Sequence, residues 1–315
     1  MRKILVTGGA GFIGTNLVGR LLELGDEVYS VDNFVIGERK HAEIYHEYPN
    51  YHFIEMDIDD ADAFCERFKE MKFDTIFHLA ANSDIKKGGQ NPQVDYRDTF
   101  STTRSVLELM RRNSIKKLFF ASTSAIYGDI NGERATEDLG GLMPISYYGG
   151  AKYACENFIS AYTFMNDLNV MVFRFPNVIG PYLTHGVIFD FIKKLKNDSS
   201  KLEILGDGHQ TKPYIYVDDL VDVIIKMTDN IQSGMDIYNI GAEGATSVTE
   251  IADILCSVLG LSGVKYDYTG GSVGWKGDVP RFQYNLNKIH NVGWKAKYNS
   301  DEAVRKTCEW MKENT

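Results

Sequence analysis

The chain has 315 residues, of which 43% are hydrophobic and 24% are charged, and these proportions are ordinary for a globular protein with a full hydrophobic core. Its formal net charge is −9 and no dense run of lysine and arginine is present, which disfavours binding to nucleic acid or to an anionic membrane surface. The four cysteines are far apart and form no CxxC or Cys/His ligand spacing, so we predict neither a metal site nor a disulfide framework.

Short apolar runs alternate with longer helical patterns over the first 175 residues. Strands are predicted at residues 3–8, 27–32, 51–57, 74–80, 116–122 and 170–175, and helices at about 12–24, 60–70, 92–113 and 147–168. The strands are nearly continuous in apolar residues, which is typical of strands covered on both faces in a parallel sheet. Repeated strand–helix units of this kind predict an α/β fold with a doubly wound parallel sheet of the Rossmann type.

The regular alternation ends after Arg174, where the sequence RFPNVIGPYLTHG is punctuated by proline and glycine. We therefore predict a first domain of residues 1–175, to which a segment near residues 213–240 returns, and a smaller mixed α/β lobe of residues 176–315. No stretch reaches the ~18 consecutive apolar residues of a membrane-spanning helix, and no apolar signal segment precedes the first strand. We expect a cytoplasmic protein that does not bind membranes.

The sequence VTGGAGFIG follows the first predicted strand and begins the first predicted helix. Its glycines Gly9, Gly11 and Gly14 match the pattern G-x-G-x-x-G, and Gly8, Gly11 and Gly14 match G-x-x-G-x-x-G. Glycines permit a tight turn and let the backbone approach a pyrophosphate at the N-terminus of a helix. With a strand before it and a helix after it, the motif predicts a dinucleotide site.

Asp32 ends the second predicted strand, 18 residues after Gly14. A carboxylate at this point would accept a hydrogen bond from the adenosine ribose and would repel a 2′-phosphate, so we predict NAD rather than NADP. Arg39 and Lys40 leave an alternative open, because a folded-back loop could offer these cations to a phosphate.

A tyrosine and a lysine lie four residues apart in SYYGGAKYACE, where Tyr148 and Lys152 would share one face of a helix. A lysine ammonium beside a phenol is expected to lower the pKa of the tyrosine and to make it a usable general base toward a sugar hydroxyl. The hydroxyls of Ser122, Thr123 and Ser124 end the fifth predicted strand, about 25 residues upstream. One of them can then meet the phenol at the same substrate oxygen.

These motifs occur together with others in a fixed order along the chain. They are TGGAGFIG (7–14), VDN (31–33), HLAA (78–81), STSAIYG (122–128), YGGAK (148–152), RFPNVIGP (174–181), GDGHQTKPYIYVDD (206–219) and GWKGDVPRF (274–282). In this order they resemble the extended short-chain dehydrogenase/reductase superfamily, and specifically its NAD-dependent nucleotide-sugar epimerases and dehydratases, such as the UDP-glucose 4-epimerase-like enzymes. The resemblance covers essentially the whole chain.

The resemblance implies a role for each matching residue. Tyr148 would be the base, Lys152 would orient the nicotinamide ribose, and Thr123 would supply the assisting hydroxyl, whereas Tyr147 is out of register. The implied cofactor-binding residues are Gly8, Gly11, Phe12, Ile13, Gly14, Asp32, Asn33, Asp57, Ile58, Leu79, Ala80, Ala81, Ser122, Tyr148, Lys152 and Phe175. The implied residues for a nucleotide-diphosphate sugar are Ser83, Ser124, Asn177, Lys212 and Arg281.

Three departures from the family pattern bear on the substrate. Lys212 stands where relatives usually carry arginine, and a lysine lacks the two-pronged guanidinium, so Arg281 is expected to supply a second cation for the diphosphate that Asn177 holds. Thr99 and Thr102 replace the Asn and Gly that the family often has, and NSDIKKGGQNP (82–92) is unusual. A non-standard sugar is therefore plausible.

Ala125 follows the hydroxyl cluster, at a position where relatives that eliminate water or decarboxylate carry an acid. Alanine cannot manage a proton near C5, which argues against a 4,6-dehydratase. The remaining reaction is oxidation at C4 followed by re-reduction, so we predict a nucleotide-sugar 4-epimerase.

The sequence leaves two other functions open. A 4-dehydrogenase would release a 4-keto nucleotide sugar, for example of a heptose, and sequence barely separates it from an epimerase. A non-catalytic dinucleotide-binding protein could share the fold, but the set of Thr123, Tyr148 and Lys152 argues against it. The resemblance also implies a homodimer formed through the helices near 92–113 and 147–168.

Overall fold

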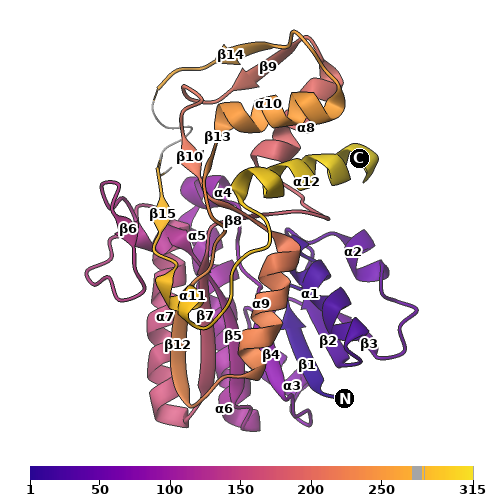
Figure 1. Ribbon diagram of the computed structural model, residues 1–315. Helices are drawn as coiled ribbons and strands as arrows, with labels where there is room; N and C mark the ends of the chain where they lie inside the picture. Colours follow the sequence, from indigo (N-terminus) through magenta and orange to yellow (C-terminus); the bar gives the residue numbers. More distant parts are fainter. Residues whose placement is uncertain (272–278, 280, 315) are drawn as a thin grey trace. The chain divides into compact units, whose positions relative to one another are not determined.

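The computed structural model describes residues 1–271, 279 and 281–314 (Figure 1). The chain divides into two compact units. The first comprises Met1–Gly128, Gly140–Phe175 and Val221–Tyr238, and the second comprises Asp129–Leu139, Pro176–Leu220 and Asn239–Thr315. None of the helices in the described ranges combines the length and the apolar character that crossing a membrane requires.

The first unit is built on a seven-stranded sheet with the strand order β12-β7-β5-β4-β1-β2-β3 (Figure 1). Its strands are β1 (Lys3–Thr7), β2 (Glu27–Asp32), β3 (Tyr51–Glu55), β4 (Thr75–His78), β5 (Lys117–Thr123), β7 (Asn169–Phe175) and β12 (Gly234–Asn239). The pairs β1–β2, β1–β4, β2–β3, β4–β5 and β5–β7 are all parallel. This is the doubly wound Rossmann arrangement that the sequence predicts.

The six strands predicted in the first 175 residues are all present, and all but the half-buried edge strand β3 have buried apolar residues. Ile4, Leu5, Val6, Leu118, Phe119 and Phe120, for example, have no exposed surface. The α-helices of these 175 residues are α1 (Phe12–Glu23), α2 (Arg39–Glu43), α3 (Ala61–Arg67), α4 (Ile85–Gln90), α5 (Pro92–Asp95), α6 (Thr102–Asn113) and α7 (Tyr147–Asn166), and most of the later helix α9 (Val217–Asp229) also belongs to the first unit. One core cluster joins the strands to α3, α6 and α7 through Phe64, Val106, Leu109, Met110 and Ile159.

The helix predicted at 92–113 is present, but it is not α-helical throughout. Its middle, Tyr96–Ser101, is a π-helical segment (η1) between α5 and α6. The hydroxyls of Thr102 and Thr103 donate to the carbonyls of Asp98 and Thr99, and so satisfy acceptors that the widened turn leaves. The short helices α2 and α4 were not predicted from the sequence.

The second unit is a mixed α/β structure with short strands. Its strands are β6 (Arg134–Ala135), β8 (Asn177–Ile179), β9 (Lys201–Ile204), β10 (Thr211–Lys212), β11 (Tyr214–Tyr216), β13 (Thr246–Ser247), β14 (Lys265–Tyr268) and β15 (Gln283–Tyr284). They form four two-stranded sheets, β10–β13, β11–β8, β14–β9 and β15–β6. Its helices are α8 (Val187–Asn197), α10 (Val248–Leu259), α11 (Asn287–Asn291) and α12 (Ser300–Asn314), and α8, α10 and α12 share one core cluster.

Candidate active site

The glycine turn between β1 and α1 is packed too closely for side chains at two positions. Gly8 has φ +76°, and a Cβ on it would lie 2.7 Å from the backbone nitrogen of Ala80, which follows β4. A Cβ on Gly14 would collide with the carbonyl oxygen of Gly8. These glycines therefore let β1, β4 and α1 meet at one point, which is where the strand order reverses and where Rossmann sheets bind their ligands.

Gly11 is less crowded than Gly8 and Gly14. A Cβ there would contact only the carbonyl oxygen of Gly8, at 3.2 Å. Gly11 precedes α1, has no side chain with which to cap the helix, and is followed by a first turn without acidic residues. The amides of that turn, from Phe12, Ile13 and Gly14, form a site of partial positive charge that fits a pyrophosphate.

Asp32 lies at the end of β2 with 8% of its surface exposed. Its carboxylate accepts hydrogen bonds from the backbone N–H groups of Ala10 (3.0 Å) and Phe34 (2.8 Å). Burial raises the pKa of Asp32, and these backbone hydrogen bonds oppose that rise. Because a carboxylate offers about four acceptor positions, acceptor capacity remains for a ribose hydroxyl.

The two cations that kept NADP open are each paired with a carboxylate. Arg39 donates to Glu55 through two nitrogens, one of them at 2.8 Å, and Lys40 lies 2.6 Å from Glu38. A 2′-phosphate would have to compete with these carboxylates and with Asp32. The side chains around Asp32 thus fit the adenosine ribose of NAD better than that of NADP.

The other predicted cofactor residues follow the carboxyl ends of parallel strands, and such ends lie along one edge of a sheet. Asn33 follows β2; Asp57 and Ile58 follow β3; Leu79, Ala80 and Ala81 follow β4; Ser122 lies near the end of β5; and Phe175 ends β7. The structure thus gathers them at one edge, and their contacts with the cofactor stay predictions.

The structure places Thr123 and Tyr148 close together. Thr123 ends β5 and Tyr148 is the second residue of α7, and the Thr123 hydroxyl is near enough to the phenol to act on its pKa. Lys152, one turn further along α7, is 2% exposed, and its Nζ donates to the carbonyl oxygen of Ala121 at 2.6 Å. Tyr147 is 56% exposed. The three residues predicted for catalysis therefore lie together at the end of β5, whereas Tyr147 lies on the surface.

The expected effect of Lys152 on Tyr148 is wrong for this structure. Burial raises the pKa of Tyr148 to about 12, and the influence that opposes this rise is the nearby Thr123 hydroxyl rather than the lysine. Burial also lowers the pKa of Lys152 to about 8. The side chain of Lys152 is buried and its ammonium donates to a backbone carbonyl, whereas Tyr148 is half-buried, so the lysine alone does not produce a phenolate.

Ser122 has a different partner from the one expected. Its hydroxyl donates to Glu156 of α7, which also accepts hydrogen bonds from Arg174 of β7. A contact between Ser122 and the cofactor would therefore have to come from its backbone, and that assignment stays a prediction. Sequence reasoning missed Glu156, whose only signal was its place one turn after Lys152.

Asp95 was also missed. It is 1% exposed, its Oδ1 accepts a hydrogen bond from Asn82 at 2.8 Å, and its Oδ2 has no hydrogen-bond partner among the described residues. Burial raises the pKa of Asp95. The negative charge of Asp95 contributes to the raised pKa of Tyr148, and it partly opposes the lowering of the Lys152 pKa by burial. It therefore belongs to the electrostatic surroundings of the candidate site. It lies between the segment 82–92 and Thr99, the two places where the sequence departs from the family pattern.

The predicted substrate residues lie in both units. Ser83, which precedes α4, is exposed, and Ser124 begins the short 3₁₀ helix η2 (Ser124–Tyr127). In the second unit, Asn177 begins β8 and is exposed. Lys212 lies in β10, and Arg281 forms a β-bridge with the adjacent Thr211. The backbone of this unit thus brings Lys212 and Arg281 onto neighbouring segments, while most of the motif GWKGDVPRF, including Asp278, lies outside the described residues.

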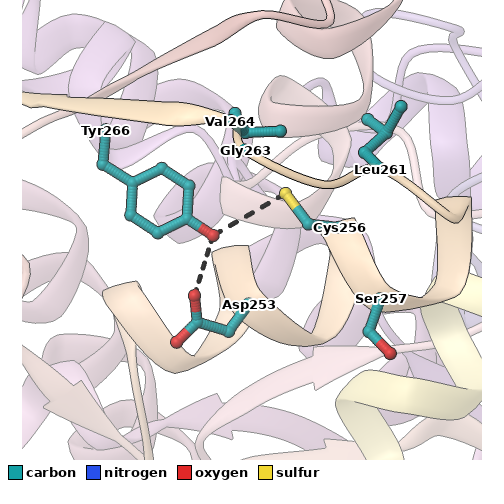
Figure 2. A pocket seen from close by; sticks show the side chains of 7 residues that line it. All are labelled: Asp253, Cys256, Ser257, Leu261, Gly263, Val264 and Tyr266. Carbon is teal, nitrogen blue, oxygen red and sulfur yellow. Dashed lines mark hydrogen bonds between the residues drawn. The ribbon is translucent and has the colours of Figure 1, made fainter.

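A shallow hollow of about 360 Å³ lies beside α10 and β14 in the second unit (Figure 2). The phenol of Tyr266 donates to Asp253 at 2.8 Å and lies 3.7 Å from the sulfur of Cys256. Its lining is Asp253, Cys256, Ser257, Leu261, Gly263, Val264 and Tyr266. None of these is a predicted site residue. The phenol of Tyr266 is already hydrogen-bonded to Asp253 and Cys256. We therefore place the candidate active site at the edge of the sheet and not in this hollow.

Comparison with known proteins shows the family to which the chain is similar. The model of the NAD dependent epimerase/dehydratase family matches residues 4–241. UDP-arabinose 4-epimerase 1 of Arabidopsis thaliana is 32% identical over 98% of this chain and 79% of its own length. A solved UDP-galactose 4-epimerase has a TM-score of 0.86 and 34% identity, with 99% of each chain covered. The UDP-glucose 4-epimerase of Thermus thermophilus, solved as a complex with NAD, has a TM-score of 0.87 and 29% identity, covering 99% of this chain and 100% of its own.

The raised pKa of Tyr148 predicts how its phenol titrates. Between about pH 10, where an ordinary tyrosine ionises, and about pH 12, the folded chain keeps a proton that the unfolded chain loses. Relative to Tyr148→Phe, the free energy of unfolding should therefore fall as the pH rises through this window. In nucleotide-free protein near pH 10, the wild type and Tyr148→Phe should have almost the same tyrosinate absorbance. A difference of about half a tyrosinate at that pH would contradict the assignment.

Proposed function

Because the chain belongs to the NAD dependent epimerase/dehydratase family, and so is an NAD-dependent enzyme, we propose that it is a nucleotide-sugar 4-epimerase. The family name covers epimerases and dehydratases, which we take to share a first oxidation of the sugar. The residues around the oxidised sugar would then decide between epimerisation and loss of water.

The observation that carries the proposal is the turn after β5. Thr123 and Tyr148, which lie close together, offer the hydroxyl and the phenol that the proposed oxidation uses, while position 125 is an alanine. The N–H of Ala125 donates to the Thr123 hydroxyl at 3.2 Å, and a Cβ on Gly149 of α7 would collide with the Ala125 carbonyl oxygen. The backbone of the turn is thus held against the first turn of α7, with no carboxylate at the position used for elimination.

Each residue of this group has a part in the proposed reaction. Thr123 would hold the C4 oxygen of the sugar, and Tyr148 would take its proton and later return it. Lys152, with a pKa of about 8, is mostly protonated at neutral pH and places a positive charge one helical turn from the phenol. NAD⁺, when bound, supplies the hydride acceptor and a further positive charge that favours the phenolate.

We propose that the second unit binds the diphosphate of the substrate. Lys212 and Arg281 lie on neighbouring segments and offer two cations, and Asn177 is exposed at the start of β8. The relatives described above are named for UDP-sugars, so UDP-sugars are the first substrates to test. The nucleotide base, the sugar and the expected cytoplasmic location stay predictions.

We also propose the homodimer through the segments around α6 and α7. Large apolar side chains are exposed on this part of the first unit: Tyr96 (58%), Phe158 (48%), Phe164 (85%) and Met165 (75%). Phe100 of η1 packs against Phe158, with ring centroids 5.1 Å apart. A second copy would remove this apolar surface from water. Light scattering should give twice the mass of one chain, and a monomer mass at micromolar concentration would refute the dimer.

Tyr148→Phe is expected to lower kcat by roughly 10²-fold or more, the scale for loss of a general base. The KM for the nucleotide sugar should change little, because the diphosphate provides most of the binding. Tyr147→Phe is the matched control, since it removes a neighbouring phenol that is 56% exposed. A larger loss from the control than from Tyr148→Phe would show that the helix register is wrong.

The mass of the product tests the function directly. Incubated with UDP-, GDP-, dTDP- or CDP-linked sugars, the enzyme should convert one of them to a C4 epimer of unchanged mass, with NADH absorbance near baseline. A product lighter by two hydrogens, with reduced cofactor left on the protein, would identify a 4-dehydrogenase. Loss of one water would refute the interpretation of Ala125.

A further inference from the structure

A buried ion pair lies directly behind the candidate catalytic residues. Glu156 of α7 and Arg174 of β7 are 3% and 4% exposed, and the guanidinium donates to the carboxylate through Nε at 3.1 Å and Nη2 at 2.7 Å. Burying two charges costs several kcal/mol per ion, so such a pair is weak evidence for stability by itself. Its other contacts indicate what it does.

The pair binds both ends of the turn that carries Thr123. Before the turn, the hydroxyl of Ser122 donates to Glu156. After it, the phenol of Tyr127 accepts a hydrogen bond from Nη1 of Arg174 at 3.0 Å, and the guanidinium lies 5.2 Å from the centre of the Tyr127 ring.

The contacts also hold the turn in register with α7. Ser122 and Arg174 are direct partners in the parallel pairing of β5 and β7, so the strand end cannot slide without breaking their shared bonds to Glu156. Glu156 lies one turn after Lys152, which binds the carbonyl of Ala121. Adjacent residues of β5 are thus tied to successive turns of one helix face.

We propose that the Glu156–Arg174 pair is a positioning device that fixes the Thr123 hydroxyl against Tyr148, acting through Ser122 on one side of the turn and Tyr127 on the other. This inference rests on the proposed function, because it assumes that Thr123 holds the reacting oxygen. Neither Ser122 nor Tyr127 needs to contact substrate in this role. Displacement of a reacting group by about 1 Å can cost on the order of 10²-fold in rate, so loosening the turn should act on kcat.

A double-mutant cycle between Ser122→Ala and Thr123→Val separates positioning from general stability. The assay substrate is the nucleotide sugar selected by the mass measurement from the UDP-, GDP-, dTDP- and CDP-linked series. Ser122→Ala keeps the ion pair and should lower kcat about tenfold, with KM and bound NAD nearly unchanged. If Ser122 acts through Thr123, adding Ser122→Ala to Thr123→Val should lower kcat no further.

Ser105→Ala is the matched control. Ser105 of α6 is also fully buried, and its hydroxyl donates to the backbone carbonyl of Ser101 at 3.1 Å, away from the ion pair. It should leave kcat within about twofold of the wild type, as expected for a change remote from reacting groups. Tyr127→Phe approaches the turn from its other end and should lower kcat like Ser122→Ala, which keeps the test usable if Ser122→Ala folds poorly.

The outcomes distinguish the two proposals. If Thr123→Val is harmful but both Ser122→Ala and Tyr127→Phe leave kcat unchanged, the positioning role is overturned and the proposed function stands. If the fold-losses in kcat of Ser122→Ala and Thr123→Val multiply in the double variant, the positioning role is also overturned, because the two residues then act independently. If Thr123→Val has no effect on kcat, the assignment of Thr123 in the proposed function fails, and the positioning role fails with it.

Discussion

Parallel pairing of the strands in the first unit is the constraint from which the site follows. It brings the carboxyl ends of β1, β2, β3, β4, β5 and β7 to one edge of the sheet. The topology alone therefore places residues that are distant in sequence near one another. Gly8 and Gly14 make this possible at its narrowest point, since neither has room for a side chain. Gly11, at the N-terminus of α1, is less crowded than these two glycines.

Burial decides the protonation of the groups behind this edge. His78, at the end of β4, is held between Thr7 and Thr103 at 2.7 and 2.9 Å, and burial lowers its pKa to about 3, so it is neutral. Burial likewise raises the pKa of Tyr148 and lowers that of Lys152. The phenol of Tyr148 is therefore neutral near pH 7, and in the proposed function the charges of Lys152 and of bound NAD⁺ favour its phenolate.

The sequence was sufficient for the sheet and for the family, since long apolar runs and a glycine turn between strand and helix are local signals. It was insufficient where an outcome depends on residues distant in the chain. The helix α4 was missed because Gly88 and Gly89 disfavour helix, yet Asp84 caps it by accepting the N–H of Lys87. The partnership of Glu156 with Arg174 and the effect of burial on Tyr148 have no local signature, and so required the fold.

The held backbone at Ala125 has a consequence for how reactions diverge in such a framework. The backbone at this position is held by its hydrogen bond to the Thr123 hydroxyl and by the close approach of Gly149. Under the proposed function, oxidation and the fate of the oxidised sugar would be carried by separable parts of the molecule. A single replacement by an acid at position 125 would then change the product while the residues for oxidation stay in place.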